Sequence, residues 1–135
     1  MNKTDLVQTR PRGAAPAIIN DLPNETGLPN GHPVPGQGRV DNHHTLTGSK
    51  ADGTLNSMNK RDTCNDWTSS NGPDGKPRVG VSWPRSPGDG WISWGTEGGC
   101  APGYSLIEGA GATEGNMAVG SNGGYGVFCC LALEP

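Results

Sequence analysis

The sequence contains few apolar residues, and this shortage limits the hydrophobic core that it can build. Hydrophobic residues make up 31% of the 135 positions, and the aromatic residues are four Trp, two Tyr and one Phe. Glycine and proline are abundant instead, with 23 and 12 residues. A chain of this length forms one domain, and a core this small requires additional stabilisation.

Long hydrophobic runs and a basic surface are also missing. No stretch approaches the length of a membrane-spanning helix, and the first six residues lack the apolar segment of a signal peptide. Ten Lys and Arg residues are scattered among 13 Asp and Glu residues, which gives a formal net charge of -3 at pH 7. Because nucleic-acid binding requires a basic patch or stripe, we expect no nucleic-acid partner, and we expect no membrane span.

The cysteines show neither the Cys-x-x-Cys spacing of zinc sites nor the Cys-x-x-Cys-His motif of haem attachment, so they predict two disulfides. They are Cys64, Cys100, Cys129 and Cys130. Adjacent cysteines rarely bond to each other, so the simplest scheme bonds Cys129 and Cys130 one each to Cys64 and Cys100, with the order left open. Disulfides persist in oxidising compartments, and we therefore expect an extracellular or cell-surface protein.

The first 43 residues differ in composition from the rest of the chain. Residues 1–42 contain six prolines and no Trp, Tyr or Phe, which excludes a long helix and a core of their own. We expect an extended Pro/Gly-rich arm over residues 1–43 that lies on the domain or on a neighbour. A sharper alternative is that Ile18 and Ile19 form a short strand that completes the sheet of another subunit.

Residues 44–135 carry the features of a β-rich domain. Short apolar runs at 78–83, 91–94, 104–107 and 125–133 are separated by turn sequences rich in Gly and Asn. No segment keeps a helical period, apart from a weak helix candidate at 51–61. We expect a mostly β fold with little helix.

Three segments of this domain carry a family resemblance. Residues 64–70 read Cys-Asn-Asp-Trp-Thr-Ser-Ser, residues 80–83 read Gly-Val-Ser-Trp, and residues 128–131 read Phe-Cys-Cys-Leu near the end of the chain. In this order they resemble the second half of C-type-lectin-like domains, in the endostatin-like branch of secreted bacterial proteins. The resemblance implies a compact, disulfide-linked C-type-lectin-like domain over residues 44–135 and a secreted binding role.

The chain also departs from that family in two respects. The usual first half, with two helices and a cysteine, has no counterpart in residues 1–43, and one cysteine of the pair at 129–130 is additional. The Glu-Pro-Asn or Gln-Pro-Asp and Trp-Asn-Asp motifs that bind calcium and sugar are absent. The resemblance therefore implies no calcium site.

The tryptophan-rich segment is the candidate ligand site. A sugar ring is recognised by an aromatic face together with planar hydrogen-bonding groups. Two tryptophans three residues apart face opposite ways in a strand, so one enters the core and the other is exposed; alternatively, all of them fill the core. The predicted ligand-binding residues are Asp89, Trp91, Trp94, Glu97, Asn122 and Tyr125.

Metal binding and catalysis receive less support. His43 and His44, with Asp41 and His32 nearby, offer zinc ligands, but adjacent histidines in an extended chain point apart. We expect solvated histidines, no metal and no cofactor. No Gly-x-Ser-x-Gly motif occurs, and the cysteines are expected to be paired, so we predict that the protein is not an enzyme.

Two functions remain open on the sequence. The first is a secreted, non-catalytic binding module that recognises a glycan or a cell-surface partner through residues 83–124. The second is a structural subunit of an extracellular filament or surface assembly, which self-associates when the arm docks on neighbouring subunits. The two hypotheses differ in the role of residues 1–43, because only assembly requires them.

Overall fold

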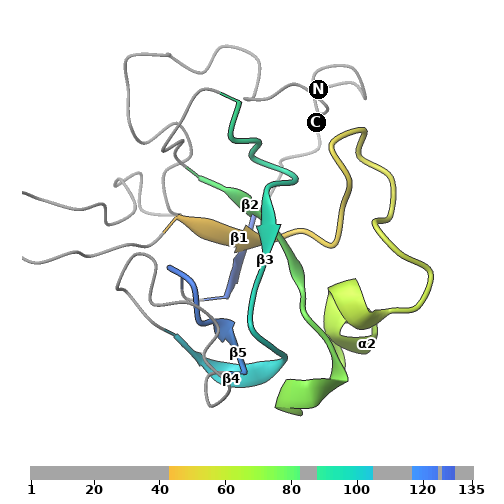
Figure 1. Ribbon diagram of the computed structural model, residues 1–135, viewed down its shortest axis with the longest axis vertical. Coiled ribbons are helices and arrows are strands. Elements are labelled where there is room, and N and C mark those ends of the chain that lie inside the picture. Colours follow the sequence, from red (N-terminus) through yellow and green to blue (C-terminus); the bar gives the residue numbers. More distant parts are fainter. Residues whose placement is uncertain (1–42, 83–87, 105–116, 125, 130–135) are drawn as a thin grey trace, which may run out of the picture.

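The computed structural model describes residues 43–82, 88–104, 117–124 and 126–129 (Figure 1). The other residues lie outside this description, and with them several of the sequence predictions. These include the arm up to residue 42 and the residues Ile18, Ile19, Tyr125 and Cys130.

The described residues form six short strands and three short helical turns, which confirms a mostly β chain with little helix. The strands are β1 (His44–Leu46), β2 (Arg78–Val81), β3 (Gly95–Thr96), β4 (Ala101–Tyr104), β5 (Ala118–Gly120) and β6 (Val127–Phe128). The turns are the 3-10 helices η1 (Arg61–Thr63) and η2 (Gly72–Asp74) and the turn α2 (Cys64–Trp67). In this part of the chain, no helix has the length and hydropathy needed to cross a bilayer.

The strands build two sheets with β1 at the centre of the larger one (Figure 1). Its order is β3-β2-β1-β6, with β1 antiparallel to β2 and parallel to β6. In this register Leu46 pairs with Val79 on one side and with Phe128 on the other. Strands β4 and β5 form a separate parallel pair. The central sheet therefore joins segments from the beginning, middle and end of the described chain.

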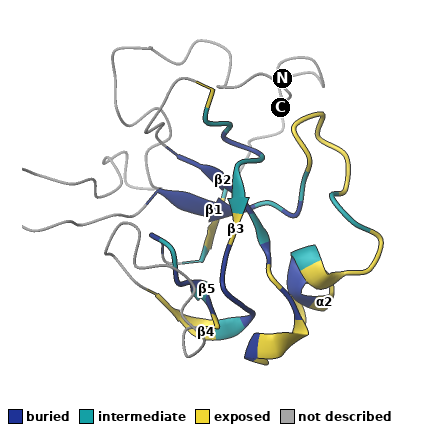
Figure 2. Cartoon of the chain, viewed as in Figure 1, coloured by how far each residue is buried: buried dark blue, intermediate teal, exposed yellow. Residues whose placement is uncertain are grey.

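The core is small and gathers around the central sheet. All three residues of β1 are buried because strands flank it on both sides, whereas most of the loop at residues 50–60 is exposed (Figure 2). The buried hydrophobic residues are Leu46, Cys64, Val79, Val81, Trp91, Ile92, Cys100 and Ala118. This short list agrees with the low apolar content of the sequence.

Two of the predicted elements are wrong. Residues 91–94 are not a strand, because the backbone there forms bends instead of an extended segment. The candidate helix at 51–61 is also absent over residues 51–60. There the backbone N–H and the hydroxyl of Thr54 both donate to Oδ1 of Asp52, and this local bonding favours a turn over a helix.

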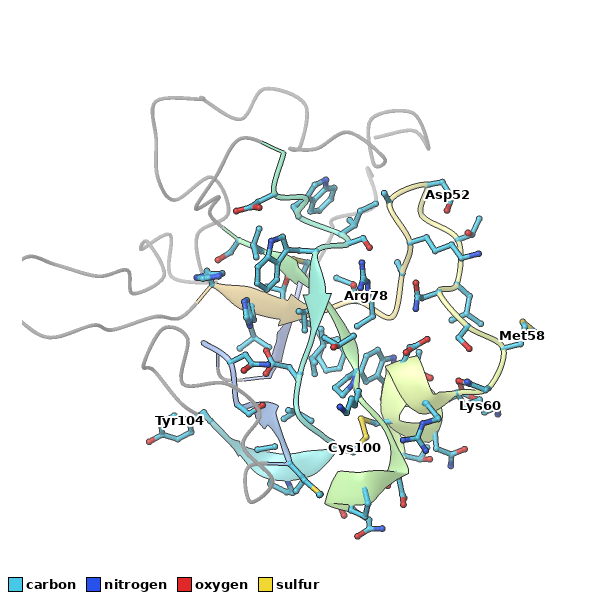
Figure 3. The ribbon with its side chains drawn as sticks, viewed as in Figure 1. Asp52, Met58, Lys60, Arg78, Cys100 and Tyr104 are labelled. Carbon is cyan, nitrogen blue, oxygen red and sulfur yellow. A yellow bond between two sulfur atoms is a disulfide. The ribbon has the colours of Figure 1, made fainter. Side chains whose placement is uncertain are left out.

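The predicted disulfide pairing requires correction, because Cys64 bonds to Cys100 (Figure 3). Neither residue is therefore available to Cys129 or Cys130. The pairing follows from the path of the backbone: the Cys100 N–H donates to the Gly72 carbonyl at 3.1 Å, which places Cys100 beside the segment that follows α2. This contact joins residues distant in sequence. The prediction is based on the adjacency of Cys129 and Cys130, which contains no information about that contact.

Gly80 in β2 provides a test of this packing. A Cβ atom at Gly80 would overlap the carbonyl oxygen of Trp91, whereas a Cβ at Gly95 in β3 would meet nothing within 4 Å. We expect Gly80→Ala to lower the free energy of unfolding by about 3 kcal/mol, and Gly95→Ala to change it by less than about 0.5 kcal/mol. Urea unfolding of both variants measures the difference, and equal effects would contradict the packing of the 90–94 segment against β2.

Candidate functional site

The residues predicted to bind a ligand do not form one surface. Trp91 and Glu97 are each only 1% exposed, so neither side chain is presented to solvent. Asp89, Trp94 and Asn122 are partly exposed. The prediction that one of the paired tryptophans enters the core is confirmed for Trp91, but Glu97 is wrongly placed at the surface by the sequence argument.

Glu97 is instead the centre of a buried polar network. Its Oε1 lies 2.6 Å from Nδ1 of His44, in a buried hydrogen bond. Its Oε2 accepts from the Ser121 hydroxyl at 3.1 Å and from the Asn122 N–H at 2.8 Å. The Ser121 hydroxyl in turn accepts from the Gly98 N–H at 2.8 Å. The network thus connects β1 of the larger sheet to the residues that follow β5 in the smaller one.

The two histidines are buried, and the expectation that they are solvated is wrong. His43 is 2% exposed and His44 is 3% exposed. Their rings meet edge to face with centroids 4.4 Å apart, and the His44 ring lies 5.0 Å from that of Trp94. In the described part of the chain, Nε2 of His44 and the Thr45 hydroxyl are buried without a hydrogen-bond partner. Central strand β1 brings these polar side chains inside, since both of its edges are paired.

The order of groups in the network determines what chemistry it can perform. In a serine hydrolase the histidine stands between the serine and the acid and removes the serine proton. Here Glu97 stands between His44 and Ser121, so the Ser121 hydroxyl donates to a carboxylate and is not activated. The described residues also contain no group of three or more His, Cys, Asp or Glu that could hold a metal ion. The arrangement is that of a structural polar network.

Three other predicted ligand residues, Asp89, Trp94 and Asn122, make hydrogen bonds within the molecule. The Trp94 indole N–H donates to Oδ1 of Asp89 at 3.0 Å. The Asn122 side-chain amide donates to the Thr96 carbonyl at 3.1 Å, and its backbone N–H serves Glu97. These groups order the loops around β3. In the described residues 88–94 of the tryptophan-rich segment, the Trp94 indole N–H and the Asp89 carboxylate are therefore already bonded to each other.

An exposed aromatic pair lies elsewhere, on α2 and β6. Trp67 is 38% exposed and Phe128 is 53% exposed, with ring centroids 5.1 Å apart at an interplanar angle of 89°. Val127, next to Phe128 in the edge strand of the described sheet, is 39% exposed. We call the pair Trp67 and Phe128 the aromatic patch; Val127 precedes Phe128 in β6 and its side chain faces the other side of the strand. Two of the seven aromatic residues of the chain thus meet at its surface.

The turn that carries Trp67 has an unusual backbone. All four residues of α2 have positive φ, from 47° at Cys64 to 63° at Trp67, so the turn is left-handed. Asn and Asp accept this conformation readily, but Cys and Trp adopt it at a cost of about 1–2 kcal/mol each. The Cys64–Cys100 disulfide and a hydrogen bond from the Asp66 N–H to the Thr63 hydroxyl hold the turn. Strain of this kind is concentrated at functional sites.

Polar side chains border the aromatic patch along the same turn. Asn65 and Thr68 are exposed, and the Asn65 amide donates to the Thr68 hydroxyl at 2.8 Å. Asp66 pairs with Lys60, and the hydrogen bond from the Lys60 ammonium lowers the pKa of the Asp66 carboxyl. The aromatic patch therefore lies beside the Asn65 amide and the Asp66 carboxylate, and Lys60 compensates the charge of that carboxylate.

The sequence argument used the run at 64–70 only for the family resemblance and did not propose Trp67 or Phe128 as site residues. One signal was present: Asn65 and Asp66 are residue types that favour a left-handed backbone. Such a backbone is able to turn the next side chain outward. The contact with Phe128 was not visible, because 60 positions separate the two aromatic residues and only the β1–β6 pairing brings their elements together.

Comparison with family models, with curated proteins and with solved structures gives no match for this chain. The C-type-lectin-like fold therefore stays a prediction drawn from residues 44–135. The functional argument that follows depends on the geometry of the described residues.

Proposed function

We propose that this chain is a secreted, non-catalytic binding module that recognises a glycan or a cell-surface partner. The observation that carries the proposal is the exposure of Trp67 and Phe128 in contact with each other on the surface. The proposal keeps the function predicted from the sequence but moves the binding surface from residues 83–124 to the aromatic patch.

The distribution of apolar side chains supports this proposal. The chain has little apolar material for its own core, so exposing a Trp and a Phe in contact forgoes stabilisation that burial would provide. Buried aromatic anchors dominate binding energies at recognition sites. Secretion is supported by the Cys64–Cys100 disulfide, a bond that persists in oxidising compartments.

Removal of the aromatic patch is the direct test. We expect Trp67→Ala and Phe128→Ala each to weaken binding to the best ligand of a glycan array, or to intact cells, by at least about tenfold. The matched control is Tyr104→Ala, because Tyr104 is another exposed aromatic residue, 63% exposed on β4, outside the aromatic patch (Figure 3). Circular dichroism and urea unfolding establish that each variant is folded.

Two outcomes would overturn the proposal. The first is unchanged binding by folded Trp67→Ala protein. The second is the detection of large particles by light scattering in the wild-type protein, together with their absence in the Trp67→Ala variant. That second result would show that the aromatic patch joins copies of the chain, and it would favour the structural subunit of an extracellular assembly.

A further inference from the structure

The aromatic patch is small compared with a protein–protein interface, and its size selects among possible ligands. A stable protein interface uses about 20–30 residues on each side. Here two aromatic side chains are exposed in contact with each other, and the exposed polar residues Asn65 and Thr68 lie before and after Trp67 along the chain. An apolar surface bounded in this way fits a compact ligand with one apolar face and a polar rim.

The charges near the aromatic patch also bear on whether its ligand is neutral or anionic. The cations closest in sequence to α2 are Lys60 and Arg61. Lys60 pairs with Asp66, and the charge of Arg61 acts on Asp74, whose pKa is lowered first by hydrogen bonds from Ser69 and Asn71 and then by Arg61. Recognition of sulfate, phosphate or carboxylate uses cations that are free to pair with the ligand. Lys60 therefore already faces a carboxylate of the chain.

From this combination we infer that the aromatic patch binds a neutral pyranose, with the C–H face of the sugar on the Trp67 ring, the perpendicular Phe128 ring against the sugar's edge, and its hydroxyl groups toward Asn65 and Asp66. This inference rests on the proposed function and specifies its ligand. Aromatic faces flanked by amide and carboxylate groups satisfy both sides of such a ring. Asn65 and Asp66 are both exposed and adjoin Trp67 in the turn.

The left-handed turn gives this site a fixed shape. The disulfide holds the first residue of α2, and the Asp66 N–H bond to Thr63 and the Ser69 N–H bond to the Cys64 carbonyl, at 2.9 Å, hold its body. A site that is already ordered loses less conformational entropy on binding. Weak stacking contacts of the kind made by a sugar ring benefit most from this preorganisation.

Titration with defined saccharides, followed by NMR of the tryptophan indole N–H groups, tests the inference. The probes are cellotetraose, maltotetraose and N-acetylated chitotetraose as neutral ligands, with a heparin tetrasaccharide and a sialylated trisaccharide as anionic ones. The Trp67 signal is assigned by its loss in Trp67→Phe. We expect at least one neutral probe to shift this signal, with an affinity that changes less than about twofold between 0.05 and 0.5 M NaCl.

Substitutions separate stacking from rim contacts. Phe128→Leu keeps the apolar volume at the sheet edge but removes the ring, and we expect it to weaken the neutral probe by about fivefold or more. Asn65→Asp keeps the shape of the rim and its tolerance of positive φ but removes the amide donor, and we expect a loss of about threefold or more. Tyr104→Ala is again the control, with an expected change of less than about twofold.

The possible failures are distinguishable from one another. Binding of only the anionic probes, with affinity that falls as salt rises, would overturn the neutral ligand. The absence of any Trp67 shift with the neutral probes would also overturn it. In that case loss of cell binding in Trp67→Ala, together with its abolition by protease treatment of the cells, would leave the proposed function standing with a protein partner. Unchanged cell binding in Trp67→Ala would overturn both.

Discussion

Replacing Cys64 and Cys100 together by alanine is expected to lower the free energy of unfolding by about 4 kcal/mol, since the bond closes a loop between residues 36 positions apart. For a domain with so small a core, this is a large part of the total stability. The loss should also release the left-handed α2 turn, because Cys64 is its first residue. Urea unfolding of the variant and the wild type under non-reducing conditions measures the change.

Peptide mapping checks that the observed bond is the one removed. Trypsin alone leaves Cys100, Cys129 and Cys130 in one fragment, since no Lys or Arg follows residue 85. Additional cleavage after Glu108 and Glu114 separates Cys100 from the later pair. We expect a non-reduced digest to link the Cys64 fragment to the Cys100 fragment. Linkage of Cys64 to residues 115–134, or a loss of stability below about 1 kcal/mol in the double variant, would contradict this prediction.

Glu97→Ala is expected to lower the free energy of unfolding by about 3–5 kcal/mol. The carboxylate accepts from His44, Ser121 and Asn122, so its removal leaves three buried groups without an acceptor and opens a cavity between the two sheets. Losses of this size are diagnostic of a broken buried network. Urea or thermal unfolding at fixed pH measures the effect.

Glu97→Gln is the matched control for that experiment. Glutamine keeps one oxygen acceptor for the Asn122 N–H and the Ser121 hydroxyl, and its amide hydrogens can face Nδ1 of His44 in the other tautomer of the ring. We therefore expect a loss of about 1–2 kcal/mol. An effect as large as that of Glu97→Ala would indicate that the negative charge, and not the set of hydrogen bonds, stabilises the network.

The network engages two of the polar residues, Glu97 and Asn122, that the sequence predicts as ligand groups. Sequence reasoning placed Glu97 and Asn122 beside an exposed tryptophan because carboxylate and amide groups suit a sugar. The structure uses the same groups to satisfy one another between the sheets, and Trp94 donates its indole N–H to Asp89. The chemical criterion, an aromatic face next to planar polar groups, is met instead at Trp67 and Asn65.

The composition determined the general character of the fold. Few apolar residues, many glycines and no helical period specify short strands joined by turns, because these properties act locally along the chain. The apolar run at 78–83 became strand β2 over Arg78–Val81. The four cysteines correctly signalled that a disulfide contributes to stability, and Cys64–Cys100 is one. Strand β1 was missed, since residues 44–46 read as a polar loop and are buried only because β2 and β6 enclose them.

Only the tertiary structure decided which residues of the chain contact one another. The disulfide pairing, the burial of His44 and Glu97, and the exposure of Trp67 beside Phe128 all depend on contacts between segments distant in sequence. The pairing of β1 with β6 joins Leu46 to Phe128 and so places Phe128 at the edge of the described sheet. A local pattern states what each segment prefers, but burial is a property of the assembled sheet, and it determines whether a polar or aromatic side chain becomes structure or surface.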